Sequence, residues 1–177
     1  YVMMAVRVGY FKVYYPLEFY AVFFSVRSKQ YEFNTMVKGE DAITTRIEEL
    51  RRKSINRSEK ILPKEVGILD TLIVAIEMLE RGFKFGNIDL MRSDAVNFTV
   101  DHERGVLIPP FSVLDGLGEA AAYSVIEARQ NGKFISKEDL LSRTKLNNTN
   151  VEHLSKLGVL DDLGDTNQIS IFDFNFD

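Results

Sequence analysis

Apolar side chains recur at helical spacing through the first 29 residues. Over residues 2–14 they fall three or four positions apart, at Val2, Val6, Tyr10, Val13 and Tyr14. Pro16 begins a second predicted helix, because proline is tolerated in a first helical turn. We expect this pair to supply a hydrophobic core. The alternative is a face that packs against residues upstream of Tyr1, since the chain opens in a helical pattern with no cap and reads as part of a longer protein.

Two amphipathic helices are predicted next, over residues 40–57 and 63–81. Apolar positions form one stripe on each helix: Ile43, Ile47 and Leu50 on the first, and Ile68, Leu72, Ile76 and Leu79 on the second. Pro63 at the start of the second helix and Gly82 after its end follow the usual asymmetry of helix termini. Both segments should therefore be helices that bury one side.

The period then changes to that of strands. Residues 97–100 and 106–108 are the best-supported arms of a β-hairpin, joined by the turn of residues 102–105. Helical patterns return beyond residue 110, with one helix ending near residue 132, one capped by Ser136, and one from about residue 150 that Gly158 closes. The predicted fold class is mainly α with a small β-hairpin.

Composition excludes several classes of protein. The chain has 177 residues, of which 45% are hydrophobic, and its net charge is −4, so disorder over the whole length is excluded. No apolar run is long enough to span a bilayer, which predicts no membrane partner. The absence of cysteine removes disulfides and thiolate chemistry and favours a reducing, cytoplasmic location. With His102 and His153 as the only histidines, we predict no metal site.

A basic stretch lies between residues 46 and 64. Seven Lys and Arg residues against three Glu residues give it a net charge of +4. One interpretation is a solvated helix face with salt bridges. The other is contact with the phosphates of a nucleic acid.

The most informative local feature is the sequence Asp115, Gly116, Leu117, Gly118, Glu119 just before a predicted helix. Glycine permits the positive φ of a tight turn and leaves no Cβ in the path of a ligand. Backbone N–H groups at the helix N-terminus can then bind a phosphate oxygen. With Leu117 directed inward and a small Ala122 between helices, this is a helix-hairpin-helix pattern, which predicts non-specific binding to a DNA backbone. The alternative is an ordinary glycine turn.

A degenerate second copy is predicted 29 residues later. Leu146 matches Leu117, Val151 matches Ala122 and Leu154 matches Val125, while Lys145 and Asn147 replace the two glycines. Asparagine adopts the left-handed conformation more readily than most residues, and Lys145 adds charge. The alternative is a packing repeat with little contact to DNA. Residues 111–177 carry a net charge of −5, so we expect weak binding to DNA by the chain alone.

The C-terminal segment Gln168, Ile169, Ser170, Ile171, Phe172 has a polar head followed by apolar residues. Such a segment can bind as a peptide in an apolar groove of a partner, with the amide at the rim and the apolar side chains in the pocket. The alternative, equally supported by these residues, is a loose end that folds back onto its own core.

Together these motifs resemble the C-terminal part of the PolC-type DNA polymerase III α subunit. The resemblance rests on VGYFKVYYPLEFYA at 8–21, ERGFKFGNIDLMRS at 80–93, LIPPFSVLDGLG at 107–118, IEARQNGKFISKEDLLSR at 126–143 and NQISIF at 167–172. It implies that residues 1–90 are the end of the helical fingers region and 91–110 a β-hairpin connector. It further implies that 111–163 are a tandem helix-hairpin-helix module that binds duplex DNA, and that 164–177 are a flexible tail with a sliding-clamp-binding motif at Gln168–Phe172.

The resemblance also implies what this chain lacks. The palm carboxylates that hold Mg²⁺ in the parent DNA-directed DNA polymerase are expected upstream of Tyr1, so no catalytic residue or cofactor is predicted here and the chain alone should be inactive. The expected partners are primer–template duplex, the sliding clamp and the rest of the polymerase chain. The alternatives are a stand-alone helix-hairpin-helix module of a repair protein and a helical protein-interaction adaptor.

Overall fold

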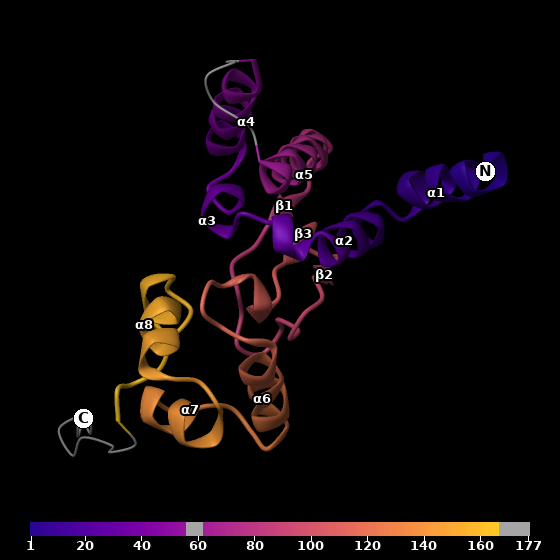
Figure 1. The fold of residues 1–177 in the computed structure, drawn as a ribbon. Coiled ribbons are helices and arrows are strands. Elements are labelled where there is room, and N and C mark those ends of the chain that lie inside the picture. Colours follow the sequence, from indigo (N-terminus) through magenta and orange to yellow (C-terminus); the bar gives the residue numbers. More distant parts are fainter. Residues whose placement is uncertain (56–61, 167–177) are drawn as a thin grey trace, which may run out of the picture.

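The computed structural model describes residues 1–55 and 62–166. Its elements are mainly helical, with one small sheet near the middle (Figure 1). The first half contains the helices α1 (Val2–Tyr14), α2 (Pro16–Val26), η1 (Ser28–Gln30), α3 (Phe33–Met36), α4 (Glu40–Ile55) and α5 (Pro63–Glu80). The second half contains the strands β1 (Lys84–Phe85), β2 (Thr99–Asp101) and β3 (Val106–Ile108), and then η2 (Phe111–Val113), α6 (Glu119–Gln130), α7 (Lys137–Arg143) and α8 (Asn148–Lys156).

The helices predicted from periodicity are confirmed, and the buried side of one of them differs in detail. Ile43, Ile47 and Leu50 of α4 are buried as expected. In α5 the buried side is shifted: Ile68 and Leu72 are joined by Thr71, Ala75 and Met78, while Ile76 and Leu79 are half-buried. The short helices η1, α3 and η2 were not predicted, because three or four residues do not carry a readable period.

An aromatic cluster joins α2 to the sheet. Phe24 of α2 is fully buried and its ring centroid lies 5.0 Å from that of Phe85 in β1. Tyr31, which follows η1, lies 5.0 Å from Phe98 and 5.4 Å from Phe85 between ring centroids, in edge-to-face arrangements that aromatic pairs favour. The expected core of the N-terminal helices is therefore confirmed for α2.

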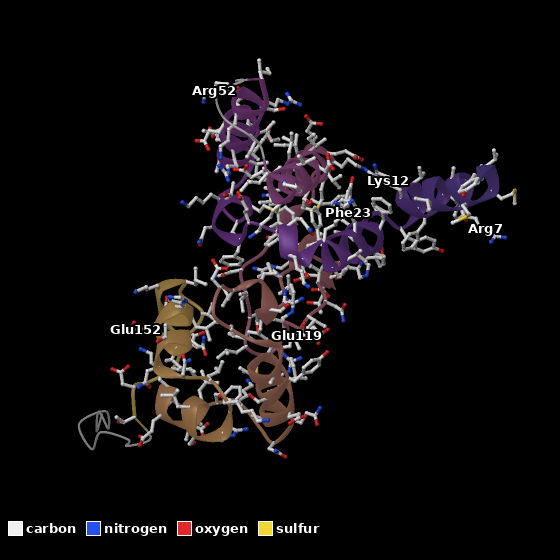
Figure 2. All side chains as sticks on the ribbon, in the orientation of Figure 1. Arg7, Lys12, Phe23, Arg52, Glu119 and Glu152 are labelled. Atoms are coloured by element: carbon white, nitrogen blue, oxygen red, sulfur yellow. The ribbon has the colours of Figure 1, made fainter. Side chains whose placement is uncertain are left out.

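Helix α1 is different, because none of its residues is buried. It projects away from the rest of the molecule, with the N-terminus at its outer end and Lys12 at its inner end (Figures 1 and 2). Only its last turn is fixed: Lys12 forms an ion pair of 2.6 Å with Glu77 of α5, and Arg81 donates to the Lys12 carbonyl oxygen at 3.2 Å. The expectation of a core is thus wrong for α1 within the described residues.

The predicted β-hairpin is confirmed and gains a third strand. β2 and β3 pair antiparallel, with Val100 opposite Leu107, and β1 adds in parallel on the other side of β3 to give the order β1-β3-β2. The chain passes very close to β3 at Gly86, where a Cβ atom would lie 2.8 Å from a methyl group of Val106. A two-residue strand that follows a helix leaves no period in the sequence, which explains why β1 was missed.

No helix within residues 1–55 and 62–166 combines the length and the apolar composition needed to cross a bilayer.

Candidate nucleic-acid interface

The first hairpin connects η2 to α6 through a tight turn that Gly116 makes possible. Gly116 has φ +81°, in the left-handed region that favours glycine, and the N–H of Leu117 donates to the Leu114 carbonyl oxygen at 3.2 Å. Leu117 is buried, as predicted, and Ala122 and Val125 of α6 are fully buried beneath it. The hairpin is therefore anchored by apolar contacts, and its tip at Gly116 and Gly118 is exposed.

Gly118 has no comparable backbone requirement. Its φ of −72° and ψ of 156° are extended and open to any residue, and a Cβ atom built there would meet no other atom within 4 Å. Packing within the described chain therefore does not explain the glycine. The absence of a side chain does keep the space in front of the α6 N-terminus open to a ligand.

The start of α6 offers unpaired backbone donors to that space. The N–H groups of Gly118, Glu119 and Ala120 have no acceptor among the described residues, whereas the next two, of Ala121 and Ala122, donate to the Gly118 carbonyl oxygen at 3.0 Å. Free N–H groups and the positive end of the helix dipole together favour an anion. Asp115 and Glu119 are exposed, and Glu119 lies at the start of α6 (Figure 2). Their carboxylates carry the same sign of charge as a phosphate, so these two residues could contribute only backbone groups.

The second hairpin, between α7 and α8, is built on the same plan. Leu146, Val151 and Leu154 are buried at the positions that match Leu117, Ala122 and Val125. The predicted left-handed conformation of Asn147 is wrong, because its φ is −105° and its ψ 171°. Asn147 is instead the N-cap of α8, and its Oδ1 accepts the Asn150 N–H at 2.8 Å, as short polar side chains do at helix starts. Its structural equivalent is Gly118, the N-cap of α6.

Two buried polar side chains that the sequence did not single out tie the hairpins together. Ser124 of α6 accepts the Lys145 N–H at 2.8 Å, and Asn150 of α8 donates its Nδ2 to the Gly116 carbonyl oxygen at 3.1 Å. Each helix thus holds the hairpin of the other motif. The signal in the sequence was a polar residue within an otherwise apolar helix face. Because its N–H is occupied, Lys145 could bind a phosphate only through its exposed ammonium group.

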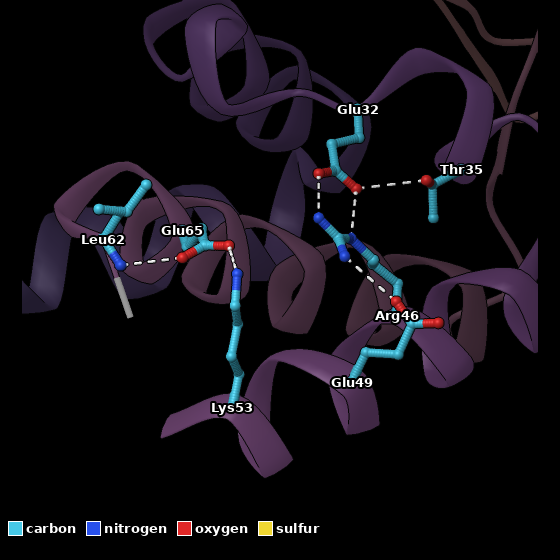
Figure 3. Close-up of polar contacts among 7 residues, drawn as sticks. All are labelled: Glu32, Thr35, Arg46, Glu49, Lys53, Leu62 and Glu65. Carbon is cyan, nitrogen blue, oxygen red and sulfur yellow. Dashed lines mark hydrogen bonds and ion pairs between the residues drawn. The ribbon is translucent and has the colours of Figure 1, made fainter. Parts of the chain in front are cut away.

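Two of the four residues that the basic stretch contributes to α4, Arg46 and Lys53, form ion pairs. Arg46 forms an ion pair of 3.0 Å with Glu32 and a second of 3.1 Å with Glu49, and Lys53 forms one of 2.6 Å with Glu65 of α5 (Figure 3). Two hydrogen bonds lower the pKa of the Glu65 carboxyl group below its ordinary value. The larger effect comes from the Leu62 N–H and the smaller from the Lys53 ammonium group. The salt-bridge interpretation is therefore confirmed for Arg46 and Lys53. Arg57 and Lys60 lie outside the described residues.

The chain beyond α8 returns to α7 before the described residues end. The N–H groups of Lys137 and Glu138 donate to the carbonyl oxygens of Gly164 and Asp165, at 2.8 and 3.2 Å, and the Lys137 ammonium forms an ion pair of 2.8 Å with the Asp165 carboxylate. The tail predicted to be flexible from residue 164 is thus held at its first two residues. The predicted clamp-binding residues Gln168, Ile169, Ser170, Ile171 and Phe172 lie outside the described residues.

In residues 1–55 and 62–166 no three His, Asp or Glu side chains come together in a group that could hold a metal ion. These residues therefore do not fit the Mg²⁺ that the resemblance implies for the parent polymerase, and no chemical step is assigned to an ion here.

Comparison with known proteins places the hairpins within a described motif. Residues 82–169 match the family described as the helix-hairpin-helix motif. The chain is 46% identical to the DNA polymerase III PolC-type of Oceanobacillus iheyensis over 172 residues, which are 97% of this chain and 12% of that protein. It is 45% identical to the enzyme of Streptococcus mutans over 174 residues and 44% identical to that of Bacillus subtilis over 172 residues. The chain spans about one-eighth of the length of these relatives.

Proposed function

The chain belongs to the PolC-type DNA polymerase III family, and from this premise we propose that it is the part of such a polymerase that binds the backbone of the nascent duplex and carries the clamp-binding segment. In this proposal, residues 1–90 end the fingers region and the two hairpins hold the duplex behind the site of synthesis. The parent polymerase performs template-directed synthesis with Mg²⁺, and its location is cytoplasmic. The duplex, the clamp and the rest of the polymerase are the proposed partners.

The single observation that carries duplex binding is the open space at Gly118. Three N–H groups at the start of α6 have no acceptor among the described residues, and Gly118 lacks a side chain there for no reason of packing or backbone geometry. A phosphate oxygen can approach such a site closely, and backbone donors recognise every phosphate alike. Binding through the first hairpin should therefore be independent of base sequence.

The second hairpin has a supporting role in this proposal. Asn150 holds the first hairpin through its hydrogen bond to the Gly116 carbonyl oxygen. In the second hairpin, the side-chain amide of Asn147 occupies the position that is open at Gly118 in the first. A second phosphate close to the start of α8 would meet the Asn147 side chain. We therefore assign the main contact with the duplex to the first hairpin. Lys145 of the second hairpin adds an electrostatic contact through its ammonium group.

The test is the affinity of Gly118→Val for a fluorescent 20-base-pair duplex, measured by anisotropy in the full-length polymerase and in this chain at low salt. Gly118→Val should weaken binding about tenfold, which corresponds to about 1.4 kcal/mol, because its side chain occupies the space of the phosphate. Gly9→Val is the matched control, since a Cβ at Gly9 of α1 also meets nothing within 4 Å. Equal affinity of the two variants and the wild type, with the fold intact, would refute the assignment.

The clamp-binding part of the proposal rests on the sequence of the tail. Gln168 supplies an amide for orientation, and Ile169, Ile171 and Phe172 supply apolar side chains for burial. Gly164 and Asp165 are held beside α7, so the segment follows only two residues after an ordered contact. A peptide that begins at a fixed point can reach a clamp that surrounds the same duplex.

A further inference from the structure

A polar cleft with a volume of about 700 Å³ separates the N-terminal helices from the hairpin module. One wall is formed by η1, the start of α3, α4 and the start of α5, and the opposite wall by η2, the first hairpin and the last turn of α8. In Figure 1 these walls are the region of α3 and the region of α8, which face each other on one side of the molecule. The duplex-binding proposal makes no use of this cleft.

Positive charge predominates among the groups that line the cleft. Lys29, Lys64 and Lys156 line it from three different elements, and each is exposed with no ion-pair partner in the described part of the chain. Residues brought together from positions so far apart form a cationic site that no sequence window shows. Cations on opposite walls favour an extended anion between them.

The acidic groups of the cleft are mostly neutralised. Both carboxylate oxygens of Glu32 accept hydrogen bonds from the Arg46 guanidinium, at 3.0 and 3.1 Å, and one also accepts the Thr35 hydroxyl at 3.2 Å (Figure 3). Glu32 therefore presents no free acceptor that would compete with or repel an anion. Among the described lining residues, Asp115 alone adds a carboxylate without a partner.

Neutral groups in the cleft fit a sugar–phosphate chain. Gln30, Asn34 and Ser112 supply amide and hydroxyl donors, which together with lysine make most protein contacts to phosphate and sugar. Leu114 and Leu157, which are half-buried, add apolar surface on which a sugar or a base can lie. A small inorganic anion needs no such apolar surface, whereas a nucleotide uses all three kinds of contact.

The cleft also leads directly to the first hairpin. Residues 112–115 line it, and Gly116–Gly118 follow them in the chain. A strand with a phosphate at the start of α6 is therefore close to the mouth of the cleft. A double helix is too wide for a cleft of 700 Å³, a volume in the usual range for small ligands, whereas a short stretch of one strand can enter.

We propose that this cleft binds the sugar–phosphate backbone of a single DNA strand that continues from the duplex held at the first hairpin. The inference rests on the proposed function, because the hairpin supplies the neighbouring duplex. Lys29, Lys64 and Lys156 bind the phosphates, and the amide and hydroxyl groups orient the backbone. Recognition is by charge and shape, so it is independent of base sequence.

The test compares two triple charge reversals in the 177-residue chain. K29E/K64E/K156E changes the cleft, and R52E/K84E/K133E makes the same change in net charge at exposed residues that do not line it. Binding of a fluorescein-labelled 12-nucleotide oligothymidylate is measured by anisotropy over a salt series, after circular dichroism and thermal unfolding have shown that both variants are folded. The neutral triple variant to Gln repeats the comparison without added negative charge.

The cleft reversal should weaken single-strand binding at least tenfold and lower the slope of log affinity against log salt by about 2, since each phosphate contact on a single strand contributes about 0.7. The control reversal should change affinity less than threefold. An equal loss of single-strand affinity in both reversals, or an unchanged salt slope in the cleft reversal, would refute strand binding in the cleft. Free thymidine triphosphate is titrated as well. If it binds the wild type and its affinity falls as much in the cleft reversal, the cleft is a nucleotide site and the proposal of a bound DNA strand is wrong.

Failure of this inference can be separated from failure of the proposed function. Gly118→Val should reduce duplex affinity and leave oligothymidylate affinity within threefold of wild type, because the cleft itself is unchanged. If Gly118→Val leaves duplex affinity intact, the hairpin proposal fails. If the cleft reversal leaves single-strand affinity intact while Gly118→Val weakens duplex binding, only the cleft proposal fails.

Discussion

At the scale of single residues, the two glycines of the first hairpin have different tasks. Gly116 adopts φ +81°, which a residue with a Cβ atom adopts only with strain, whereas Gly118 has an extended backbone and open space around it. One glycine is required by the turn. The other is required by nothing in the described chain and is therefore the better indicator of a ligand.

This difference predicts unequal effects on stability for the same substitution at the two positions. Gly116→Ala should lower the free energy of unfolding by about 1–2 kcal/mol because of backbone strain. Gly118→Ala should change it by less than about 1 kcal/mol, since lower chain entropy of the unfolded state offsets a poorer N-cap. Gly132→Ala is the control, with φ +113° and equally open space outside the hairpin. Urea unfolding measures all three, and equal effects at 116 and 118 would contradict the structural distinction.

The buried leucines of the hairpin module should matter more for stability than its half-buried residues. Ile126 of α6 is only half-buried, whereas Leu154 of α8 is fully buried. Leu154→Ala should therefore cost about 2–5 kcal/mol of unfolding free energy. Ile126→Ala should cost clearly less in the same unfolding experiment. A larger loss for Ile126→Ala would show that the packing of α6 differs from that described.

Asp101 makes stability depend on pH at the acid end. Arg92 forms an ion pair of 2.8 Å with the Asp101 carboxylate. The hydrogen bond within this pair lowers the pKa of the Asp101 carboxyl group below its ordinary value of about 3.9, and a hydrogen bond from the Arg104 N–H lowers it further. A carboxyl group with a lowered pKa stabilises the folded state above its unfolded pKa, and this contribution is lost as pH falls through the folded value.

Asp101→Asn tests this dependence, since the amide has no charge to lose. The melting temperature of the wild type should fall more steeply than that of the variant as pH is lowered from 5 to 2, with most of the difference developing below about pH 4. Thermal unfolding followed by circular dichroism gives both curves. Parallel curves would mean that the Asp101–Arg92 ion pair does not stabilise the fold.

At the scale of elements, α1 and the start of the tail are opposite cases. Helix α1 is rich in apolar residues, yet none of its residues is buried, and Tyr10 is 57% exposed. The segment of Gly164 and Asp165 is polar, yet its carbonyl oxygens accept the first two N–H groups of α7. Burial here follows from what lies next to an element, which its own composition does not reveal.

Amide hydrogen exchange should report this contrast. In the 177-residue chain, amides of residues 3–10 should exchange much faster than those of α2 and α5, because only Lys12 and the turn around it are fixed to α5. The Lys137 and Glu138 amides should be protected, and removing residues 164–177 should increase their exchange rates. Slow exchange throughout α1 would show that another surface covers it in solution.

At the scale of the whole molecule, charge limits what the chain can bind by itself. Its net charge is −4, and residues 111–177 alone carry −5, so long-range attraction to DNA is weak. The hairpin and the cleft are therefore proposed as local contacts within a larger polymerase. Polymerase chemistry needs carboxylates that hold metal ions, and the described residues contain no such group, so we predict no nucleotide incorporation by this chain alone in a primer-extension assay with Mg²⁺ and all four nucleotides. Measurable extension by pure chain would contradict it.

The tail should connect this molecule to the sliding clamp. A peptide of residues 165–177 should bind purified clamp with a dissociation constant near the micromolar range, about −8 kcal/mol, because burial of three apolar side chains is partly offset by ordering of the peptide. Phe172→Ala should be the most damaging change and Ser170→Ala nearly silent. Equal titration curves for the wild-type and Phe172→Ala peptides would refute the motif.

Much of the fold was predictable because the relevant interactions are local. Pro63 and Gly82 mark the ends of α5, and the alternating pattern around residues 97–108 marks the antiparallel pair β2 and β3. The positive φ of Gly116 and the burial of Leu117 follow from a short motif. In each case the information lies within a few residues, where sequence patterns are reliable.

The sequence by itself determined the helices, the antiparallel strand pair, the two hairpins and the family, because each depends on neighbouring residues or on a long ordered match. Only the tertiary structure decided that α1 is uncovered, that β1 joins the sheet, that Ser124 and Asn150 link the hairpins, and that Lys29, Lys64 and Lys156 meet at one cleft. Those features depend on contacts between residues far apart in the chain, and such contacts leave no period, spacing or composition in any one segment.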